Sequence, residues 1–329
     1  MAVLGLAAAL RLVGIEHGLP DSVLNQDERD IVPRAWAMTH GGGLDPHWFD
    51  RPSLVLYLLA PFQSWPDDPS YLAARLPIVA VALGAVAAAW WLGQRAYGTA
   101  AGFVAAAATA VATTHVAYSR IAVTDVPLTL GVAVALALLV SGRIELAGLA
   151  VGLATSAQYQ GLVLLAPLVA AAWGSWRRLV IACALAVAAF AVTSPYVVIH
   201  FGRAVGDAWG VGPPAPIAVV EQLWDSLGPA LLVAVAGLVL ALVSRTRADL
   251  VLASFCLAYV AYLLTIDAHF ERYVLPLVPA LGALAGRLRS LAPVTALLLI
   301  IPLTWSIRDA RELTVGSPPA RGVTAIRAE

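Results

Sequence analysis

The chain has 329 residues, of which 60% are hydrophobic and 12% are charged, and its formal net charge is zero. A soluble domain averages about 45–50% apolar and about 25% charged residues, so this composition excludes an ordinary soluble enzyme. Nucleic-acid binding is excluded as well, because the chain has no basic stripe to neutralise phosphates. Apolar runs of about 20 residues recur along the chain and predict a polytopic membrane protein built of helices, since barrel strands would alternate apolar and polar residues.

The apolar runs predict an all-α fold of about eleven transmembrane helices. Two of the runs, 144–157 and 161–175, are short for a bilayer core and predict a tilted or partly re-entrant hairpin. The predicted spans are 1–16, 72–94, 99–118, 124–141, 144–157, 161–175, 179–199, 227–244, 248–266, 272–286 and 291–306.

Charges at the span ends predict the orientation of the chain in the membrane. Arginines gather at alternate ends, and the positive-inside rule places those ends and the N-terminus in the cytoplasm. Most acidic residues lie at the opposite ends, and an odd number of spans places the C-terminal tail on that external side. The arginines predicted to face the cytoplasm are Arg95, Arg143, Arg177, Arg178, Arg245, Arg247, Arg287 and Arg289.

The predicted external face carries the substantial loops. The first, 17–71, is longer than most connections in compact proteins, and such long loops are usually functional. Within it we expect a helix from Asp27 to His40, ended by three glycines, and an amphipathic interfacial helix from Ser53 to Phe62. The second loop, 200–226, contains three prolines and is not expected to be regular helix.

Spans and loops together predict one transmembrane domain over 1–307. Residues 308–329 form a short external tail that is rich in Arg, Pro and Gly and is expected to be poorly ordered.

Three carboxylates on the external side are candidate catalytic groups. Asp27 and Glu28 are adjacent on a short helix, so one can point into a cleft while the other anchors the helix. Asp125 lies at the next external turn, where an ionisable residue at membrane depth is costly and usually functional. The alternative for each is a helix N-terminal cap, because acidic residues favour the positive end of a helix.

External arginines suit an anionic lipid phosphate, which a guanidinium binds through two parallel hydrogen bonds. The alternative is that they only extend to water or to lipid headgroups. The six histidines show no metal-ligand spacing, and no nucleotide-binding glycine loop occurs. The external arginines are Arg51, Arg75, Arg120 and Arg272.

These motifs together resemble the GT-C glycosyltransferases, in particular the prokaryotic protein-O-mannosyltransferase and aminoarabinose-transferase branch. The resemblance rests on the first loop from Asn25 to Pro61 and on four later segments in the same order. Those segments are Ala74-Arg75-Leu76-Pro77, Ser119-Arg120 with Asp125-Val126-Pro127, Gly152-Leu153-Ala154 through Gln158-Tyr159, and Arg272-Tyr273-Val274-Leu275-Pro276.

The resemblance implies an inverting enzyme of a prokaryotic plasma membrane that transfers a sugar from a polyprenyl-phosphate donor to a hydroxyl acceptor on the external face. Asp27 would be the general base, Glu28 would orient the loop or the acceptor, and Asp125 would support the base. Relatives usually carry lysine at the position of Gln158. Residues expected at the donor phosphate are Arg51, Arg272, Arg75, Arg120 and Gln158, and those expected at the substrate are Tyr57, His47, Tyr159, His269 and Tyr273.

We expect no required cofactor, although the oligosaccharyltransferase relatives use a divalent ion. The acceptor remains open among a protein, a glycolipid and a cell-wall glycan. A transporter or flippase for a lipid-linked sugar or a small anion is the main alternative, and it would place ionisable residues near the bilayer midplane, often in repeated halves. A silent membrane scaffold, the third reading, would not need the external acidic residues.

Overall fold

The structure, a computed structural model, describes residues 1–19, 25–207, 216–266 and 270–315. The regular elements in these residues are all helical, which confirms the predicted fold class. The α-helices are α1 (Ala2–Leu12), α2 (Gln26–Thr39), α3 (Leu54–Leu59), α4 (Tyr71–Tyr97), α5 (Thr99–Val111), α6 (Thr113–Tyr118), α7 (Asp125–Val140), α8 (Ile144–Ala157), α9 (Leu165–Ala171), α10 (Trp176–Thr193), α11 (Pro195–Ile199), α12 (Phe201–Asp207), α13 (Pro216–Leu227), α14 (Ala230–Ser244), α15 (Arg247–Leu263), α16 (Leu277–Arg287), α17 (Ala292–Leu298) and α18 (Ile300–Val315). Short 3₁₀ turns are η1 (Ala60–Gln63), η2 (Tyr159–Leu164), η3 (Glu271–Val274) and η4 (Arg289–Leu291).

Three stretches within the described residues are long and apolar enough to cross a membrane alone: Tyr71–Tyr97, Trp176–Thr193 and Arg289–Thr314. A fourth forms if α13 and α14, which meet at 115°, count as one broken span. The predicted count of about eleven is not confirmed, because several apolar runs are divided into shorter helices. The run 99–118, for example, breaks at Ala112 into α5 and α6.

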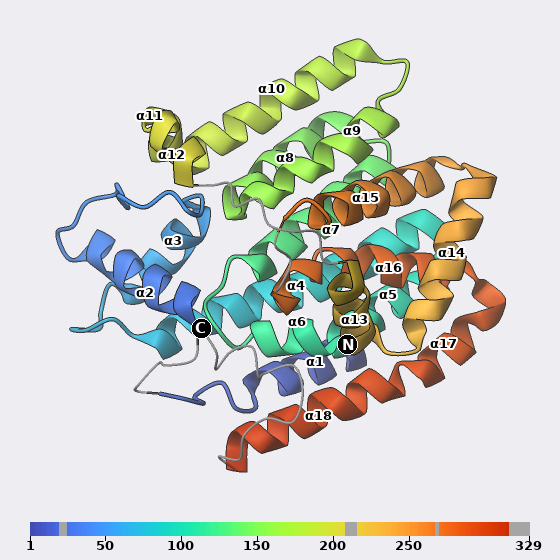
Figure 1. The fold of residues 1–329 in the computed structure, drawn as a ribbon, viewed down its shortest axis with the longest axis horizontal. Helices are drawn as coiled ribbons and strands as arrows, with labels where there is room; N and C mark the ends of the chain where they lie inside the picture. The colour runs from blue at the N-terminus through green and yellow to red at the C-terminus, as the bar shows by residue number, and fades with distance from the viewer. Residues whose placement is uncertain (20–24, 208–215, 267–269, 316–329) are drawn as a thin grey trace.

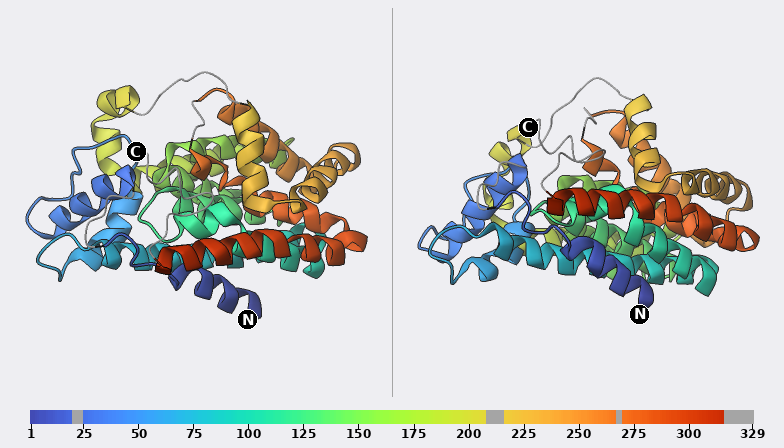
Figure 2. Two further views of the ribbon diagram at one scale, coloured as in Figure 1. Left: turned by 60° about the horizontal axis from the view of Figure 1, so that its bottom comes forward. Right: turned by 90° about the horizontal axis from the view of Figure 1, so that it is seen from below.

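The long helix α4 forms the centre of the molecule and packs against α5, α7 and α16. Helices α2 and α3 lie at one end of the long axis of the molecule, and α14 lies toward the other (Figure 1). Helices α8 and α10 pack along one edge, whereas α1 and α18 lie along the opposite edge (Figures 1 and 2). The first loop is therefore held at one end of a helical bundle.

Both helices predicted in the first loop are present. Helix α2 begins after Asn25, whose side-chain Oδ1 accepts a 2.9 Å hydrogen bond from the Asp27 amide, and it ends at Thr39 before the glycines. This Asn25 contact is the N-terminal cap that satisfies an otherwise unpaired amide. Helix α3 and turn η1 together cover the predicted second helix from residue 54 to 63.

Two expectations about irregular segments are wrong. Much of the second loop, predicted over 200–226, is helical, since it contains α12 and nearly all of α13. Helix α13 can begin at Pro216 because the first residues of a helix need no hydrogen bond from their amides. Helix α18 continues to Val315, so the segment just after residue 307 is helical rather than poorly ordered, and the boundary predicted at 307 falls within this helix. The remaining predicted tail, 316–329, and residues 208–215 lie outside the described residues.

Glycines allow α8 and α10 to approach closely. A methyl group built on Gly148 would overlap the Ala182 carbonyl, and one on Gly152 would overlap the carbonyl of Ala186. Small residues at such crossings are typical of membrane helix pairs, which lack a hydrophobic driving force between them and associate through close packing.

We therefore expect Gly152→Ala to destabilise the protein, because overpacking a tight contact costs about 1–3 kcal/mol. The control is Gly5→Ala in α1, where nothing lies within 4 Å of the added methyl group. Thermal unfolding of the detergent-solubilised variants should give a lower Tm for Gly152→Ala alone. Equal Tm values would contradict the close packing of α8 and α10.

Candidate active site

Two aspartates and two arginines meet near the end of the bundle that carries α2 and α3. Asp27 lies in the first turn of α2, Arg51 precedes α3, Asp125 begins α7, and Arg272 lies in η3. Arg272 is placed between the two carboxylates, with Nη2 3.4 Å from Asp27 Oδ2 and Nε 3.6 Å from Asp125 Oδ2. Nη2 of Arg51 lies 3.9 Å from Asp27 Oδ1. These distances are those of ion pairs rather than of close hydrogen bonds.

The four charged groups differ in accessibility. The Asp125 side chain is fully buried and that of Arg272 is 4% exposed, whereas those of Asp27 and Arg51 keep 12% and 23% of their surface. Burial acts to lower the pKa of Arg51, but the carboxylates of Asp27 and Asp125 help to outweigh it, so the pKa is raised. The group able to meet a substrate is therefore Asp27 rather than Asp125.

Aromatic rings surround Arg272. Its guanidinium carbon lies 4.5 Å from the centroid of the Phe270 ring and 5.8 Å from that of Tyr273. Such contacts favour a desolvated cation, since the ring face is negative. Tyr273 was predicted at the substrate and lies beside the cluster, whereas Phe270, its neighbour across Arg272, was missed because a lone aromatic residue carries no distinguishing pattern.

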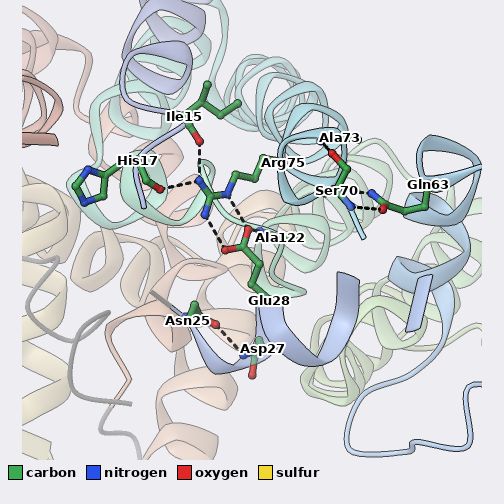
Figure 3. Close-up of polar contacts among 10 residues, drawn as sticks. All are labelled: Ile15, His17, Asn25, Asp27, Glu28, Gln63, Ser70, Ala73, Arg75 and Ala122. Carbon is green, nitrogen blue, oxygen red and sulfur yellow. Dashed lines mark hydrogen bonds and ion pairs between the residues drawn. The ribbon is translucent and has the colours of Figure 1, made fainter. Parts of the chain in front are cut away.

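A second, fully buried ion pair holds the first loop against the bundle (Figure 3). Arg75 Nε and Nη2 donate to the two carboxylate oxygens of Glu28 at 2.8 and 2.9 Å. Nη1 of Arg75 donates to the carbonyls of Ile15 and His17, and Glu28 Oε1 also accepts from the Ala122 amide at 3.1 Å. This network joins α2, α4, the segment after α1 and the turn before α7.

The network separates the roles of the two adjacent carboxylates. Glu28 turns to Arg75, while Asp27 turns to Arg51 and Arg272. Adjacent positions on a helix point about 100° apart, which is why one residue can anchor α2 while the other enters the cluster. Arg75 was predicted to bind the donor phosphate. In the structure its side chain is only 1% exposed and is bonded to protein oxygens.

Two other residues predicted at the donor phosphate have side chains directed to different parts of the molecule. Gln158 is buried and accepts a 3.2 Å hydrogen bond from the hydroxyl of Thr124, the residue before Asp125. Arg120 instead donates through Nε and Nη2 to the Leu10 carbonyl, so its guanidinium is directed at α1.

Residues predicted at the substrate mainly support the first loop. The hydroxyl of Tyr57 donates to the Leu44 carbonyl, and that of Tyr159 donates to the Phe49 carbonyl. His47 is exposed, with Nδ1 3.4 Å from Asp45 Oδ2. His269 lies outside the described residues.

A contact between the two loops predicted to be external was missed by the sequence reasoning. His200 Nε2 lies 3.2 Å from Asp45 Oδ2, and the ring of His200 packs against Phe49 at a centroid distance of 5.4 Å. The two residues of the polar contact are 155 positions apart. No local pattern predicts such a contact, because the two residues stand in separate loops of the sequence.

An apolar cavity of about 500 Å³ adjoins this loop contact. It lies between α8, α10 and the short helices α11 and α12, and Tyr159, Phe190 and Val197 are among its lining residues. Tyr159 therefore connects the cavity wall to Phe49, two residues before Arg51. Across the residues that the structure describes, no three His, Cys, Asp or Glu side chains gather closely enough to hold a metal ion.

The fold is similar to those of solved membrane glycosyltransferases. ArnT from Cupriavidus metallidurans matches in the apo state with a TM-score of 0.71 at 18% identity, covering 99% of this chain and 67% of that one. The same protein bound to undecaprenyl phosphate matches with a TM-score of 0.66 at 16% identity, over 99% of this chain and 73% of that one. The archaeal oligosaccharyltransferase AglB from Archaeoglobus fulgidus, in complex with an inhibitory peptide and a dolichol-phosphate, matches with a TM-score of 0.64 at 11% identity, over 97% of this chain and 56% of that one.

The chain has the GT-C fold. No family model and no curated protein sequence matches it. The likeness to ArnT and AglB confirms the resemblance drawn from the sequence at the level of the fold, and the chain is a membrane protein with candidate spans of its own. At sequence identities of 11–18%, this likeness shows the fold and does not identify the sugar donor or the acceptor.

Glu28→Gln should strongly destabilise the protein, because it leaves Arg75 as an uncompensated buried charge, a loss of about 3–5 kcal/mol. The matched control is Asp30→Asn on the same helix, where the pair with Arg34 is more than a third exposed on the Asp30 side and is worth at most about 1 kcal/mol. Thermal unfolding in detergent compares the two variants. A Tm for Glu28→Gln equal to that of the control would show that the ion pair does not hold the loop.

The raised pKa of Glu271 predicts that the stability of the folded protein depends on pH. Burial, followed by the negative charges of Asp225 and Asp309, raises its pKa to about 7. A carboxyl whose pKa is higher in the folded than in the unfolded state stabilises the fold below its unfolded pKa, and that stability is lost as the pH rises through the folded pKa. Wild-type Tm should therefore fall between about pH 4.5 and pH 7 more steeply than that of Glu271→Gln. Parallel Tm profiles would contradict the buried position of this carboxyl.

Proposed function

We propose that the chain is an inverting glycosyltransferase that moves a mannose-like or pentose sugar from a polyprenyl-phosphate donor to a hydroxyl acceptor on the external face of the membrane. The observation that carries the proposal is the position of Arg272, held between Asp27 and Asp125 with Arg51 on the other side of Asp27. This arrangement combines an accessible carboxylate with two guanidinium groups. A transfer between a hydroxyl and a sugar phosphate needs both.

In the proposed reaction the acceptor hydroxyl gives its proton to Asp27 as its oxygen bonds to the anomeric carbon. The bond from that carbon to the phosphate oxygen breaks, and its electron pair leaves with the lipid phosphate. Attack from the face opposite the leaving group inverts the configuration. Arg51 and Arg272 stabilise the charge that develops on the phosphate, as preorganised cations do in a water-poor site.

Asp125 acts in this proposal as a positioning residue. Its buried carboxylate lies 3.6 Å from Nε of Arg272, which favours one orientation of the guanidinium. Arg272 then offers its outer nitrogens toward Asp27 and an incoming phosphate. Glu28 and Arg75 act further away, by fixing α2 and therefore the side chain of Asp27.

The apolar cavity near Tyr159 supports a lipid-linked donor. Its lining is almost entirely aliphatic and aromatic, which suits an isoprenoid segment and repels water. Tyr159 contacts the loop that carries Arg51, so a chain in the cavity would have its phosphate end near the arginines. The structures of ArnT and AglB noted above contain undecaprenyl phosphate and dolichol-phosphate, respectively, which agrees with this class of donor.

The test is sugar transfer by the purified protein in nanodiscs, offered a panel of radiolabelled polyprenyl-phosphate sugars and hydroxyl acceptors. Asp27→Asn should lower transfer or slow donor hydrolysis by about 10²–10⁴-fold, the usual contribution of a general base. Asp30→Asn, on the same helix and outside the cluster, should leave the rate unchanged. A chelator should also leave it unchanged, since the proposal includes no metal.

Three outcomes would count against the proposal. Undiminished transfer by Asp27→Asn would remove Asp27 as the base, and loss of activity on chelation would require a metal. Translocation of a lipid-linked sugar across a sealed vesicle, without cleavage of the sugar phosphate bond, would favour a flippase instead.

A further inference from the structure

A polar cleft lies at the end of the bundle opposite the candidate active site. Its volume is about 480 Å³, and it is formed by the ends of α4, α7, α15 and α16. The charged residues that line it are Arg95, Arg247, Arg287, Arg289 and Asp249.

Asp249 balances only one of these arginines. Arg287 donates to Oδ1 and Oδ2 of Asp249 at 2.7 and 3.1 Å, and the hydroxyls of Tyr97 and Thr246 donate to the same carboxylate. Arg95, Arg247 and Arg289 form no ion pair with a carboxylate in the part of the chain that the structure describes. The cleft therefore carries three arginine charges with no acidic partner there, which makes it a strongly positive surface.

Two of these arginines are held in place by helix ends. Arg289 donates through Nε and Nη2 to the Tyr97 carbonyl at the end of α4, and Arg247 donates through Nε to the Leu139 carbonyl near the end of α7. These hydrogen bonds to the helix ends occupy one edge of each guanidinium group. They leave Nη1 and Nη2 of Arg247, and all of Arg95, for a ligand, and they lower the entropy lost on binding because Arg247 is already positioned.

The cleft is separated from the candidate active site by the thickness of a bilayer. Helix α4 carries Arg75, which anchors the first loop, near one end and Arg95, which lines the cleft, near the other. The intervening helix is about 30 Å long at 1.5 Å per residue, which equals the hydrocarbon thickness of a bilayer. The cleft therefore belongs to the opposite membrane surface, which the arginine distribution predicts to be cytoplasmic. The exposed apolar residues Val243 and Leu250, close in the sequence to the lining residues 246–249, suit contact with acyl chains.

We propose that this cleft binds a phosphate group, carried by an anionic phospholipid headgroup or by a soluble phosphate ester. Guanidinium groups match phosphate in geometry and charge. Basic pockets between transmembrane helices on the cytoplasmic side recognise anionic headgroups in this way. The proposal is independent of the glycosyltransferase activity, since none of its residues belongs to the aspartate and arginine cluster.

The experiment measures ligand-induced shifts of Tm, and native mass spectrometry of bound lipid, for the full chain in detergent. One arm adds phosphatidylglycerol with phosphatidylcholine as the neutral comparison, and the other adds pyrophosphate. Arg95→Gln and Arg247→Gln should each weaken binding about fivefold, the usual effect of one arginine near an anionic surface. Arg247→Lys should weaken binding less than Arg247→Gln does, because it keeps the charge but loses the guanidinium geometry and the hydrogen bond from Nε to Leu139.

The matched control is Arg177→Gln, which removes an exposed arginine from the same predicted face but from outside the cleft. It should bind as the wild type does, and so should Asp27→Asn, whose change lies at the other end of the molecule. Binding of phosphatidylglycerol that falls only in the cleft variants would identify a lipid site, and the same pattern with pyrophosphate alone would identify a soluble ligand. Binding of neither probe, or an equal loss in Arg177→Gln, would overturn the proposal.

Discussion

The ion pair between Glu28 and Arg75 lies where four segments of the chain meet. Both side chains are almost completely removed from solvent, so their charges are tolerable only because each satisfies the other and the remaining donors find carbonyl oxygens. The pair joins α2 to α4 and, through the Ala122 amide, to the turn before α7. The position of Asp27, one residue away, follows from this anchorage. A loop of more than fifty residues can thus hold the proposed catalytic group with the precision that chemistry requires.

Charge balance in the neighbouring cluster explains how its charged groups can be largely buried. Two carboxylates and two guanidinium groups neutralise one another without ligand, which limits the cost of their desolvation. Arg272 contacts both aspartates at distances longer than close hydrogen bonds, so a phosphate can compete for its nitrogens. The graded exposure of the four groups gives each a different role. The buried Asp125 lies beside Arg272, and in the proposed reaction the more accessible Asp27 and Arg51 meet the substrate.

The two polar regions stand at opposite ends of a shared set of helices. Helices α4, α7 and α16 carry or adjoin Arg75, Asp125 and Arg272 at one end, and they line the basic cleft at the other. Small residues on α7 and α16 let these helices pack closely against their neighbours α8 and α5. A methyl group on Gly286 would overlap α5, and one on Gly131 would overlap α8. Tight apolar packing separates two charged surfaces, the one proposed to bind a lipid-linked sugar and the one proposed to bind a phosphate.

The sequence by itself determined the features that depend on local composition and spacing. Hydropathy predicted an all-helical membrane protein, three glycines predicted where the first helix of the first loop ends, and the order of five motifs indicated the GT-C fold. Tertiary structure alone decided which charged residues meet. Glu28 finds Arg75 across 47 positions, Asp45 finds His200 across 155, and Arg120 turns to Leu10 rather than to the cluster. It also decided where apolar runs break into shorter helices, as at Ala112. The reason is physical: hydropathy and helix signals act over a few residues, whereas a buried charge takes whichever partner the packed chain brings within a few ångströms.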